Sequence, residues 1–222
     1  MNIIVLIPAY NAARTLPELL ERSRQAGVVA PSDILVINDG SSDTTRAIAK
    51  HNGVGLIDHL ENKGKGAALQ TGFDYALSKG YDAVITMDAD LQHKPEDLPR
   101  FIQLASLQQY DVIIGSRLHN KKGMPLHRIL SNTLTTFFVK MRTGVNITDS
   151  QSGFRFIKRQ VLKEVRLLSN GFEAETEFLI KAAAFGFSFG SLPIDTIYAG
   201  EKSHMTHIQT TINFIKVLFK QY

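Results

Sequence analysis

The clearest candidates for binding or catalysis in this sequence are two carboxylates separated by one residue, Asp88-Ala89-Asp90. They leave the end of a short apolar run, residues 83–87, which is typical of a buried strand. Carboxylate oxygens are hard ligands that suit Mg²⁺ or Mn²⁺, and such ions also take oxygens from a substrate diphosphate. Gln92 and His93 follow at once and can complete the coordination shell. The pattern predicts a metal site; the alternative is a solvated acidic turn, because D-x-D also occurs by chance.

Asp39 occupies an equivalent place after another apolar run, residues 33–38. An acidic side chain there can accept hydrogen bonds from a ribose or the edge of a base. The residues that follow, Ser41, Ser42 and Asp43, are good helix caps, so capping is the alternative role of this cluster. We predict that Asp39 itself contacts a ligand.

Two cationic segments are candidates for binding phosphate. Arg117 ends the apolar run 112–115, and we expect it to hold a phosphate rather than to pair with Asp111 on the surface. The loop Asn62-Lys63-Gly64-Lys65-Gly66 resembles a phosphate loop in composition but lacks the G-x-x-x-x-G-K-[ST] pattern. For Lys65, phosphate binding and a solvated loop before the next helix therefore remain open.

The elements that must position these residues alternate between strand and helix. Apolar runs predict strands at 3–7, 33–38, 54–59, 83–87 and 112–115, and helical patterns predict helices at 15–26, 44–50 and 67–78. Such a series predicts an α/β fold with a mostly parallel central sheet and helices on both faces. Ligands bind beyond the carboxyl ends of the strands in such sheets. The polar clusters 8–11, 39–43, 88–92 and 115–117 all fall at that edge.

The pattern changes after residue 117. We expect helices at 126–142, 172–185 and 208–219, a strand at 188–197 and a turn at 149–157. The apolar face of the 126–142 helix either packs on the sheet or contacts a membrane or partner, and the terminal helix suits core packing or a dimer face. No linker divides the chain, so residues 1–222 are expected to form one domain, with a specialised second half over 118–222.

Composition excludes several classes of protein. The chain has 44% hydrophobic and 21% charged residues and no cysteine, which rules out disorder, disulfide scaffolds, thiolate metal sites and cysteine nucleophiles. Residues 1–117 carry 11 Lys and Arg against 14 Asp and Glu, whereas residues 118–222 carry 14 against 7. The basic second half suits an anionic partner, but no aromatic and basic platform indicates nucleic acid. The opening residues do not read as a signal peptide, and no apolar stretch suits a membrane span, so we expect a soluble or peripheral protein.

Six segments in order carry a family resemblance. They are residues 7–11 (IPAYN), 36–44 (VINDGSSDT), 62–69 (NKGKGAAL), 87–93 (MDADLQH), 115–117 (GSR) and 151–155 (QSGFR). Together they resemble family 2 glycosyltransferases of the GT-A fold, of the kind similar to dolichol-phosphate mannose synthase. The resemblance spans roughly residues 3–204.

The resemblance implies a nucleotide-sugar donor, a divalent metal ion and inversion at the anomeric carbon. It implies a nucleoside site formed by Pro8, Ala9, Tyr10 and Asp39. Asp88, Asp90 and Gln92 would hold the metal ion and the diphosphate. Arg117 and Arg128 would lie near the reacting phosphates, with Lys202 and Ser203 closing over them. Asp90, Arg117 and Arg128 are thus the expected catalytic residues.

These observations lead to one interpretation and two alternatives. We expect a hexosyltransferase, with a donor of the GDP-mannose or UDP-glucose type, that acts on a polyprenyl phosphate at the cytoplasmic side of a membrane. An acceptor phosphate is already an anion and needs no general base. The first alternative is a saccharide or protein hydroxyl acceptor with Glu173, Glu175 or Glu177 as the base. The second is a non-catalytic paralogue that binds a nucleotide sugar.

Overall fold

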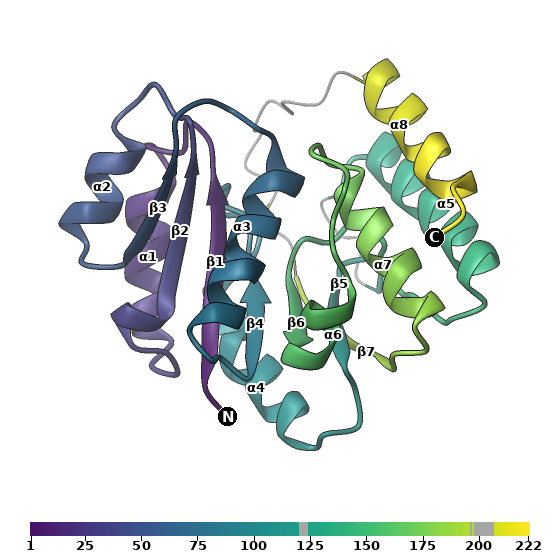
Figure 1. Ribbon diagram of the computed structural model, residues 1–222, viewed down its shortest axis with the longest axis horizontal. Helices are drawn as coiled ribbons and strands as arrows, with labels where there is room; N and C mark the ends of the chain where they lie inside the picture. The colour runs from purple at the N-terminus through teal and green to yellow at the C-terminus, as the bar shows by residue number, and fades with distance from the viewer. Residues whose placement is uncertain (120–123, 196, 198–206) are drawn as a thin grey trace.

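A computed structural model describes residues 1–119, 124–195, 197 and 207–222 of the chain. Its centre is a seven-stranded sheet with the order β3-β2-β1-β4-β6-β5-β7 (Figure 1). The strands are β1 (Ile3–Ala9), β2 (Ile34–Asp39), β3 (Gly55–His59), β4 (Ala83–Thr86), β5 (Val112–Ser116), β6 (Arg155–Lys158) and β7 (Phe189–Pro193). β6 is antiparallel to β4 and β5, whereas the other pairings are parallel. The predicted mostly parallel α/β fold is confirmed.

Helices cover both faces of this sheet (Figure 1). They are α1 (Leu16–Gln25), α2 (Thr45–His51), α3 (Lys65–Ser78), α4 (Leu98–Ser106), α5 (Leu126–Thr143), α6 (Arg159–Glu164), α7 (Ala174–Ala184) and α8 (His207–Phe219), with short 3₁₀ turns at Pro31–Asp33 and Pro95–Asp97. None of the helices in the described part of the chain is long and apolar enough to cross a membrane.

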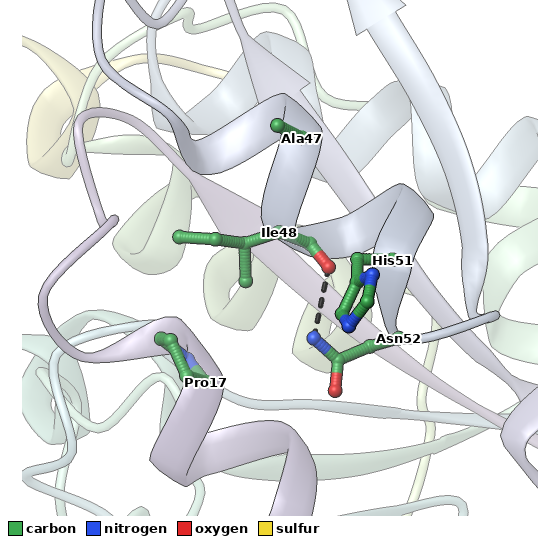
Figure 2. A pocket seen from close by; sticks show the side chains of 5 residues that line it. All are labelled: Pro17, Ala47, Ile48, His51 and Asn52. Atoms are coloured by element: carbon green, nitrogen blue, oxygen red, sulfur yellow. Dashed lines mark hydrogen bonds between the residues drawn. The ribbon is translucent and has the colours of Figure 1, made fainter.

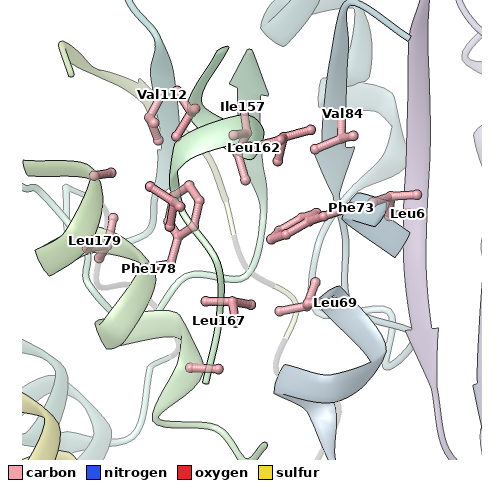
Figure 3. Close-up of a cluster of buried hydrophobic side chains, with 14 of the residues drawn as sticks. Leu6, Leu69, Phe73, Val84, Val112, Ile157, Leu162, Leu167, Phe178 and Leu179 are labelled. Atoms are coloured by element: carbon pink, nitrogen blue, oxygen red, sulfur yellow. The ribbon is translucent and has the colours of Figure 1, made fainter. Parts of the chain in front are cut away.

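Two buried clusters hold the layers together. Alternate residues along each strand point to opposite faces, so Leu6 and Val84 pack with Phe73 of α3 and Phe178 of α7 on one side (Figure 3). On the other side, Val5 and its neighbours pack against α1 and α4. Strands buried on both faces explain the continuous apolar runs in the sequence.

The structure adds elements that the sequence pattern did not predict. Helix α4 buries Leu98, Phe101 and Ala105 at helical spacing, and the expected turn at 149–157 leads into strand β6. Strand β7 is also shorter than the expected 188–197. Because β6 inserts between β4 and β5, a strand from the second half of the chain completes the sheet built by the first.

Candidate active site

The polar clusters meet at the carboxyl edge of the sheet, as predicted. The 8–11 and 39–43 segments are joined directly, because the Asn11 N–H donates to Ser41 Oγ (2.9 Å) and Asn11 Oδ1 accepts from the Ser42 N–H (2.9 Å). Thr15, at the start of α1, donates its hydroxyl to the carbonyl of Ala89 at 2.6 Å. Hydrogen bonds thus link the loops that follow β1, β2 and β4.

Asp39, at the end of β2, is buried and anchors the lysine–glycine loop. Its carboxylate accepts the N–H groups of Lys63 (3.0 Å) and Gly64 (2.8 Å), and His59 Nδ1 lies 2.6 Å from Oδ1. Asp43, just before α2, accepts the N–H of Thr45, the first residue of that helix, at 2.9 Å. Asp39 therefore fixes the loop that leads to Lys65, in addition to any contact with a ligand.

Lys65, the first residue of α3, lies between two carboxylates. Its Nζ is 2.5 Å from Asp88 Oδ1 and 3.0 Å from Glu175 Oε1. Glu175 Oε2 in turn lies 2.7 Å from Arg155, whose guanidinium is almost completely buried. A chain of alternating charges thus runs from the interior to the first carboxylate of the D-x-D pair.

This arrangement keeps both Lys65 and Asp88 charged. Burial by itself would raise the pKa of Asp88, but the charge and hydrogen bond of Lys65, together with the charge of Arg117, lower it to about 2. Burial likewise opposes the charge on Lys65, and Asp88 and Glu175 outweigh it, so the pKa of Lys65 is raised. Asp88 is therefore an anion across the physiological pH range, as a metal ligand must be.

Two glycines permit the close approach of these segments. A Cβ atom on Gly153 would lie 2.7 Å from Asp88 Oδ2, and one on Gly66 would lie 2.1 Å from the carbonyl oxygen of Ser169. Both distances are shorter than real Cβ contacts allow. The Q-S-G-F-R and N-K-G-K-G segments thus need glycine because another segment packs directly on the backbone.

The second carboxylate of the pair is oriented by its own loop. Asp90 Oδ1 accepts the N–H of Gln92 at 3.0 Å. The Gln92 side chain in turn faces α5, since its Oε1 accepts from Arg128 at 3.5 Å. The first turn of α5 therefore reaches the same edge of the sheet as Asp90.

Arg117 does not pair with Asp111, the surface partner weighed in the sequence analysis. Its Nε and Nη2 donate to the two oxygens of the buried Asp149, at 2.8 and 3.0 Å, and its backbone N–H donates to the same carboxylate. Asp111 instead pairs with Lys158 and Ser188. A bidentate pair with a buried partner fixes the guanidinium plane of Arg117 at the end of β5.

His93 has an unusual environment. Both of its ring nitrogens are buried without a hydrogen-bond partner, and the ring packs 5.2 Å from that of Phe154. Burial lowers the pKa of His93 to about 4, so the imidazole is neutral at pH 7. It contributes packing beneath the D-x-D segment and no charge.

The three glutamates proposed as alternative bases differ in their surroundings. Both Glu175 and Glu177 are buried, and Glu177 is held by Lys181 (2.6 Å) and the N–H groups of Leu168 and Ser169. Burial would raise the pKa of Glu177, but these partners lower it. Glu173 remains half-buried, with a long bond from the Gly171 N–H (3.4 Å).

The remaining predicted residues fall into two groups. Pro8 and Ala9 end β1, where Ala9 is buried and presents only its backbone, and Tyr10 beyond them is 45% exposed. Lys202 and Ser203 lie outside the described residues. Tyr10 is thus the member of the expected nucleoside set with the most accessible side chain.

The donor set suits a hard divalent cation. Asp88 and Asp90 supply carboxylate oxygens and Gln92 supplies an amide oxygen, the ligand types that Mg²⁺ and Mn²⁺ prefer. Among the described residues, no three His, Asp or Glu side chains form a metal site by themselves. The residues therefore fit a cation that takes its other ligands from a phosphate or water.

Sequence reasoning missed Asp149 and Arg155 and gave Glu175 a different role. Arg155 lies between two phenylalanines in the sequence, and a charged residue in such a setting signals a buried ion pair. A separate pocket lies between α1 and α2, lined by Pro17, Ala47, Ile48, His51 and Asn52 (Figure 2). It contains none of the predicted site residues.

Comparisons with known proteins agree with this geometry. The sequence model described as "Glycosyl transferase family 2" matches residues 4–166. The undecaprenyl-phosphate mannosyltransferase of Micrococcus luteus is 32% identical over 206 residues, covering 87% of this chain and 83% of the relative. The UDP-N-acetylglucosamine–dolichyl-phosphate N-acetylglucosaminyltransferase of Methanococcus voltae is 32% identical over 218 residues, covering 88% and 86%.

A solved structure shares the fold. Glucosyl-3-phosphoglycerate synthase from Mycobacterium tuberculosis, in complex with Mn²⁺, uridine diphosphate and phosphoglyceric acid, aligns with a TM-score of 0.76 at 17% identity. The alignment covers 98% of this chain and 77% of that one. The fold is the GT-A fold, and the chain belongs to glycosyl transferase family 2.

Proposed function

We propose that this protein transfers a hexose from a nucleotide sugar to a polyprenyl phosphate, with Mg²⁺ or Mn²⁺ and with inversion at the anomeric carbon. The observation that carries the proposal is the meeting of carboxylates and arginines at one edge of the sheet, where Asp88 and Asp90 lie with Arg117 and Arg128. Relatives that are 32% identical and are named for transfer to undecaprenyl or dolichyl phosphate support this class of acceptor.

Residues 1–117 would form the donor half. The nucleoside would lie against Tyr10 and the ends of β1 and β2. Three hydrogen-bonding partners already occupy most of the roughly four acceptor positions of Asp39, so its main role would be to hold the 62–64 loop beside the nucleoside. Lys65 would then reach the donor diphosphate from the N-terminus of α3, where backbone N–H groups also favour an anion.

Asp88, Asp90 and Gln92 would hold the divalent cation. A bound cation supplies charge stabilisation to the departing nucleoside diphosphate. Arg117 and Arg128 would stabilise the same developing charge and orient the acceptor phosphate, and the Asp149 pair would keep Arg117 in place. In the transfer, an acceptor phosphate oxygen bonds to the anomeric carbon while the bond from that carbon to the donor diphosphate breaks.

An anionic acceptor agrees with the state of the nearby glutamates. Glu175 is occupied by Lys65 and Arg155, and Glu177 by Lys181 and two backbone N–H groups. Neither carboxylate is placed to take a proton from a hydroxyl. Residues 118–222 would form the acceptor half and meet the lipid at the cytoplasmic face of a membrane.

One observation favours a second candidate function. Glu173 at the start of α7 is half-buried, and among the described residues its carboxylate makes only a long hydrogen bond, so it is the glutamate best able to act as a base. If it does, the acceptor would be a saccharide or protein hydroxyl.

A donor screen tests the proposal. Purified protein would be incubated with labelled nucleotide sugars and vesicles containing undecaprenyl phosphate, with Mg²⁺, Mn²⁺ or EDTA. We expect an organic-extractable, acid-labile glycolipid with one class of donor, and none with EDTA. Metal-dependent donor binding without glycolipid would favour the hydroxyl acceptor, and glycolipid formation in EDTA would contradict the metal assignment.

A further inference from the structure

Helix α5 exposes the apolar side of its surface. Six large apolar side chains are at least 40% exposed: Leu126 (83%), Leu130 (70%), Leu134 (51%), Phe137 (53%), Phe138 (40%) and Met141 (68%). At about 100° per residue they fall within an arc of about 120° on the helix. The buried residues, Thr136 and Val139, lie on the opposite side. A surface helix normally turns its apolar stripe toward the core, and α5 does the reverse.

Helix α8 lies beside α5 and repeats this arrangement on a smaller scale (Figure 1). Val217 and Leu218 are buried, whereas Ile212 (42%), Ile215 (48%) and Phe219 (77%) are exposed. Arg142 near the end of α5 donates to the carbonyls of Leu218 and Lys220 and so joins the ends of the two helices. We call the exposed side chains of α5 and α8 the α5–α8 face.

The charge around this face has one sign. Arg128, Lys140 and Arg142 lie on α5 and Lys216 and Lys220 lie on or just after α8, whereas neither 126–143 nor 207–222 contains Asp or Glu. An exposed apolar stripe with flanking cations and no anions is typical of a helix that lies in the interface of an anionic membrane.

The face also begins next to the candidate active site. Arg128 in the first turn of α5 contacts Gln92, two residues after Asp90, whereas Leu126 and Leu130 on the same turns are exposed. One end of α5 therefore reaches the reacting groups while its length presents the apolar stripe outward.

We propose that the α5–α8 face docks on an anionic lipid bilayer, with α5 in the plane of the membrane interface and the active site at the bilayer surface. The docking stands on the face itself; only its purpose, delivery of a lipid-phosphate acceptor to Arg128, rests on the proposed function. A second copy of the chain is a poorer occupant. A symmetric dimer through this face would bring two sets of five cations together without an acidic partner on either helix.

Vesicle binding tests the docking without any reaction. Purified protein would be floated with vesicles of phosphatidylglycerol and phosphatidylethanolamine, or of phosphatidylcholine alone. The test variant is Leu130→Glu with Phe137→Glu, and the matched control is Leu107→Glu, which replaces a 59% exposed leucine after α4. We expect the wild type and the control to bind anionic vesicles at least tenfold more tightly than neutral ones. The double variant should lose at least tenfold of this affinity at an unchanged melting temperature.

Two outcomes would overturn the proposal. One is an equal affinity of the wild type and the double variant for anionic vesicles, or no affinity in either. The other is a wild-type dimer in sedimentation velocity that the double variant converts to a monomer. An assay of transfer to a short, water-soluble polyprenyl phosphate separates this proposal from the proposed function. If the face only docks the protein on a membrane, the wild type and the double variant should transfer sugar to this acceptor at equal rates. If the wild type binds vesicles but neither protein transfers sugar, the proposed function is contradicted and the docking is not.

Discussion

The ammonium group of Lys65 lies 2.5 Å from the carboxylate of Asp88, where a divalent cation would also bind. Glu175 holds Lys65 from the other side and is itself held by the buried Arg155. Asp88, the first of the two proposed metal ligands, is therefore kept charged by an internal cation before any metal or donor arrives. A metal ion that binds alone meets the repulsion of Lys65, whereas a donor diphosphate brings negative charge that both cations can share.

Replacing Lys65 by Gln should change metal and nucleotide binding in opposite directions. The variant loses the repulsive charge, so Mn²⁺ should bind about tenfold more tightly without nucleotide, and a nucleoside diphosphate should bind more weakly. Electron paramagnetic resonance of free Mn²⁺ and calorimetry would measure the two affinities. Lys63→Gln, an exposed position in the same loop, is the matched control. Weaker Mn²⁺ binding in the Lys65 variant would contradict the account.

Asp90→Ala should abolish metal-dependent donor binding and leave the fold intact. Asp90 is partly exposed and accepts the N–H of Gln92 within its own loop, so the substitution should leave the sheet and its helices in place. We expect activity to fall by at least about 100-fold with a change in melting temperature of a few degrees at most. Asp74→Ala, an exposed carboxylate on α3, controls for surface charge. Activity like that of the wild type would refute the metal assignment.

His93 should make stability depend on pH. Burial lowers its pKa from 6.5 to about 4, so between these values the unfolded chain binds a proton that the folded chain does not. Stability is therefore full above pH 6.5 and falls as the pH drops toward 4, with a loss of roughly 3 kcal/mol. Urea unfolding in metal-free buffer at pH 7 and 4.5 measures the slope of the unfolding free energy against pH. His93→Phe should flatten it, and an equal slope in the variant would show that other groups cause it.

Asp149 should act as a positioning residue through Arg117. Asp149→Asn removes the charged bidentate partner, and breaking a buried pair in this way should destabilise the fold by about 3 kcal/mol. We expect kcat to fall at least tenfold while the affinity for the nucleotide changes little. Asp111→Asn, which breaks a pair with Lys158 away from the site, is the control. An equal loss of kcat in both variants would assign the effect to stability alone.

Much of the fold and part of the site could be predicted because their signals are local. The runs before Asp39, Asp88 and Arg117 are apolar because parallel strands are buried on both faces, and ligand residues follow strand ends in this architecture. The D-x-D spacing needs no long-range information. The family resemblance then indicated that these clusters bind different parts of one nucleotide-sugar donor.

The partners of these residues could not be predicted in the same way. Asp149 is 32 residues from Arg117, and Glu175 meets Lys65 only because β6 and α7 fold back onto the edge of the sheet. The sequence also could not show whether the apolar stripe on α5 faces the core or the solvent, because periodicity predicts a stripe but not its surroundings. Long-range packing decided both.

Glu173→Gln distinguishes the two candidate acceptors. With a phosphate acceptor the variant should retain activity within about tenfold, because no proton is taken from the acceptor. Within the described part of the chain, the Glu173 carboxylate makes only a 3.4 Å hydrogen bond with a backbone N–H, so the change should not disturb the fold. Steady-state rates of the variant and of the wild type measure this difference in activity. A loss of about a thousandfold or more would identify Glu173 as a base and favour a hydroxyl acceptor.

The most direct measurement compares two acceptors that differ only in their head group. Polyprenyl phosphate and the polyprenol of the same length would be offered in identical vesicles, with the donor identified by screening and with Mn²⁺. The account predicts glycolipid from the phosphate and none from the alcohol, with the anomeric configuration of the product opposite to that of the donor. Transfer to the alcohol, or a product that retains the donor configuration, would contradict it.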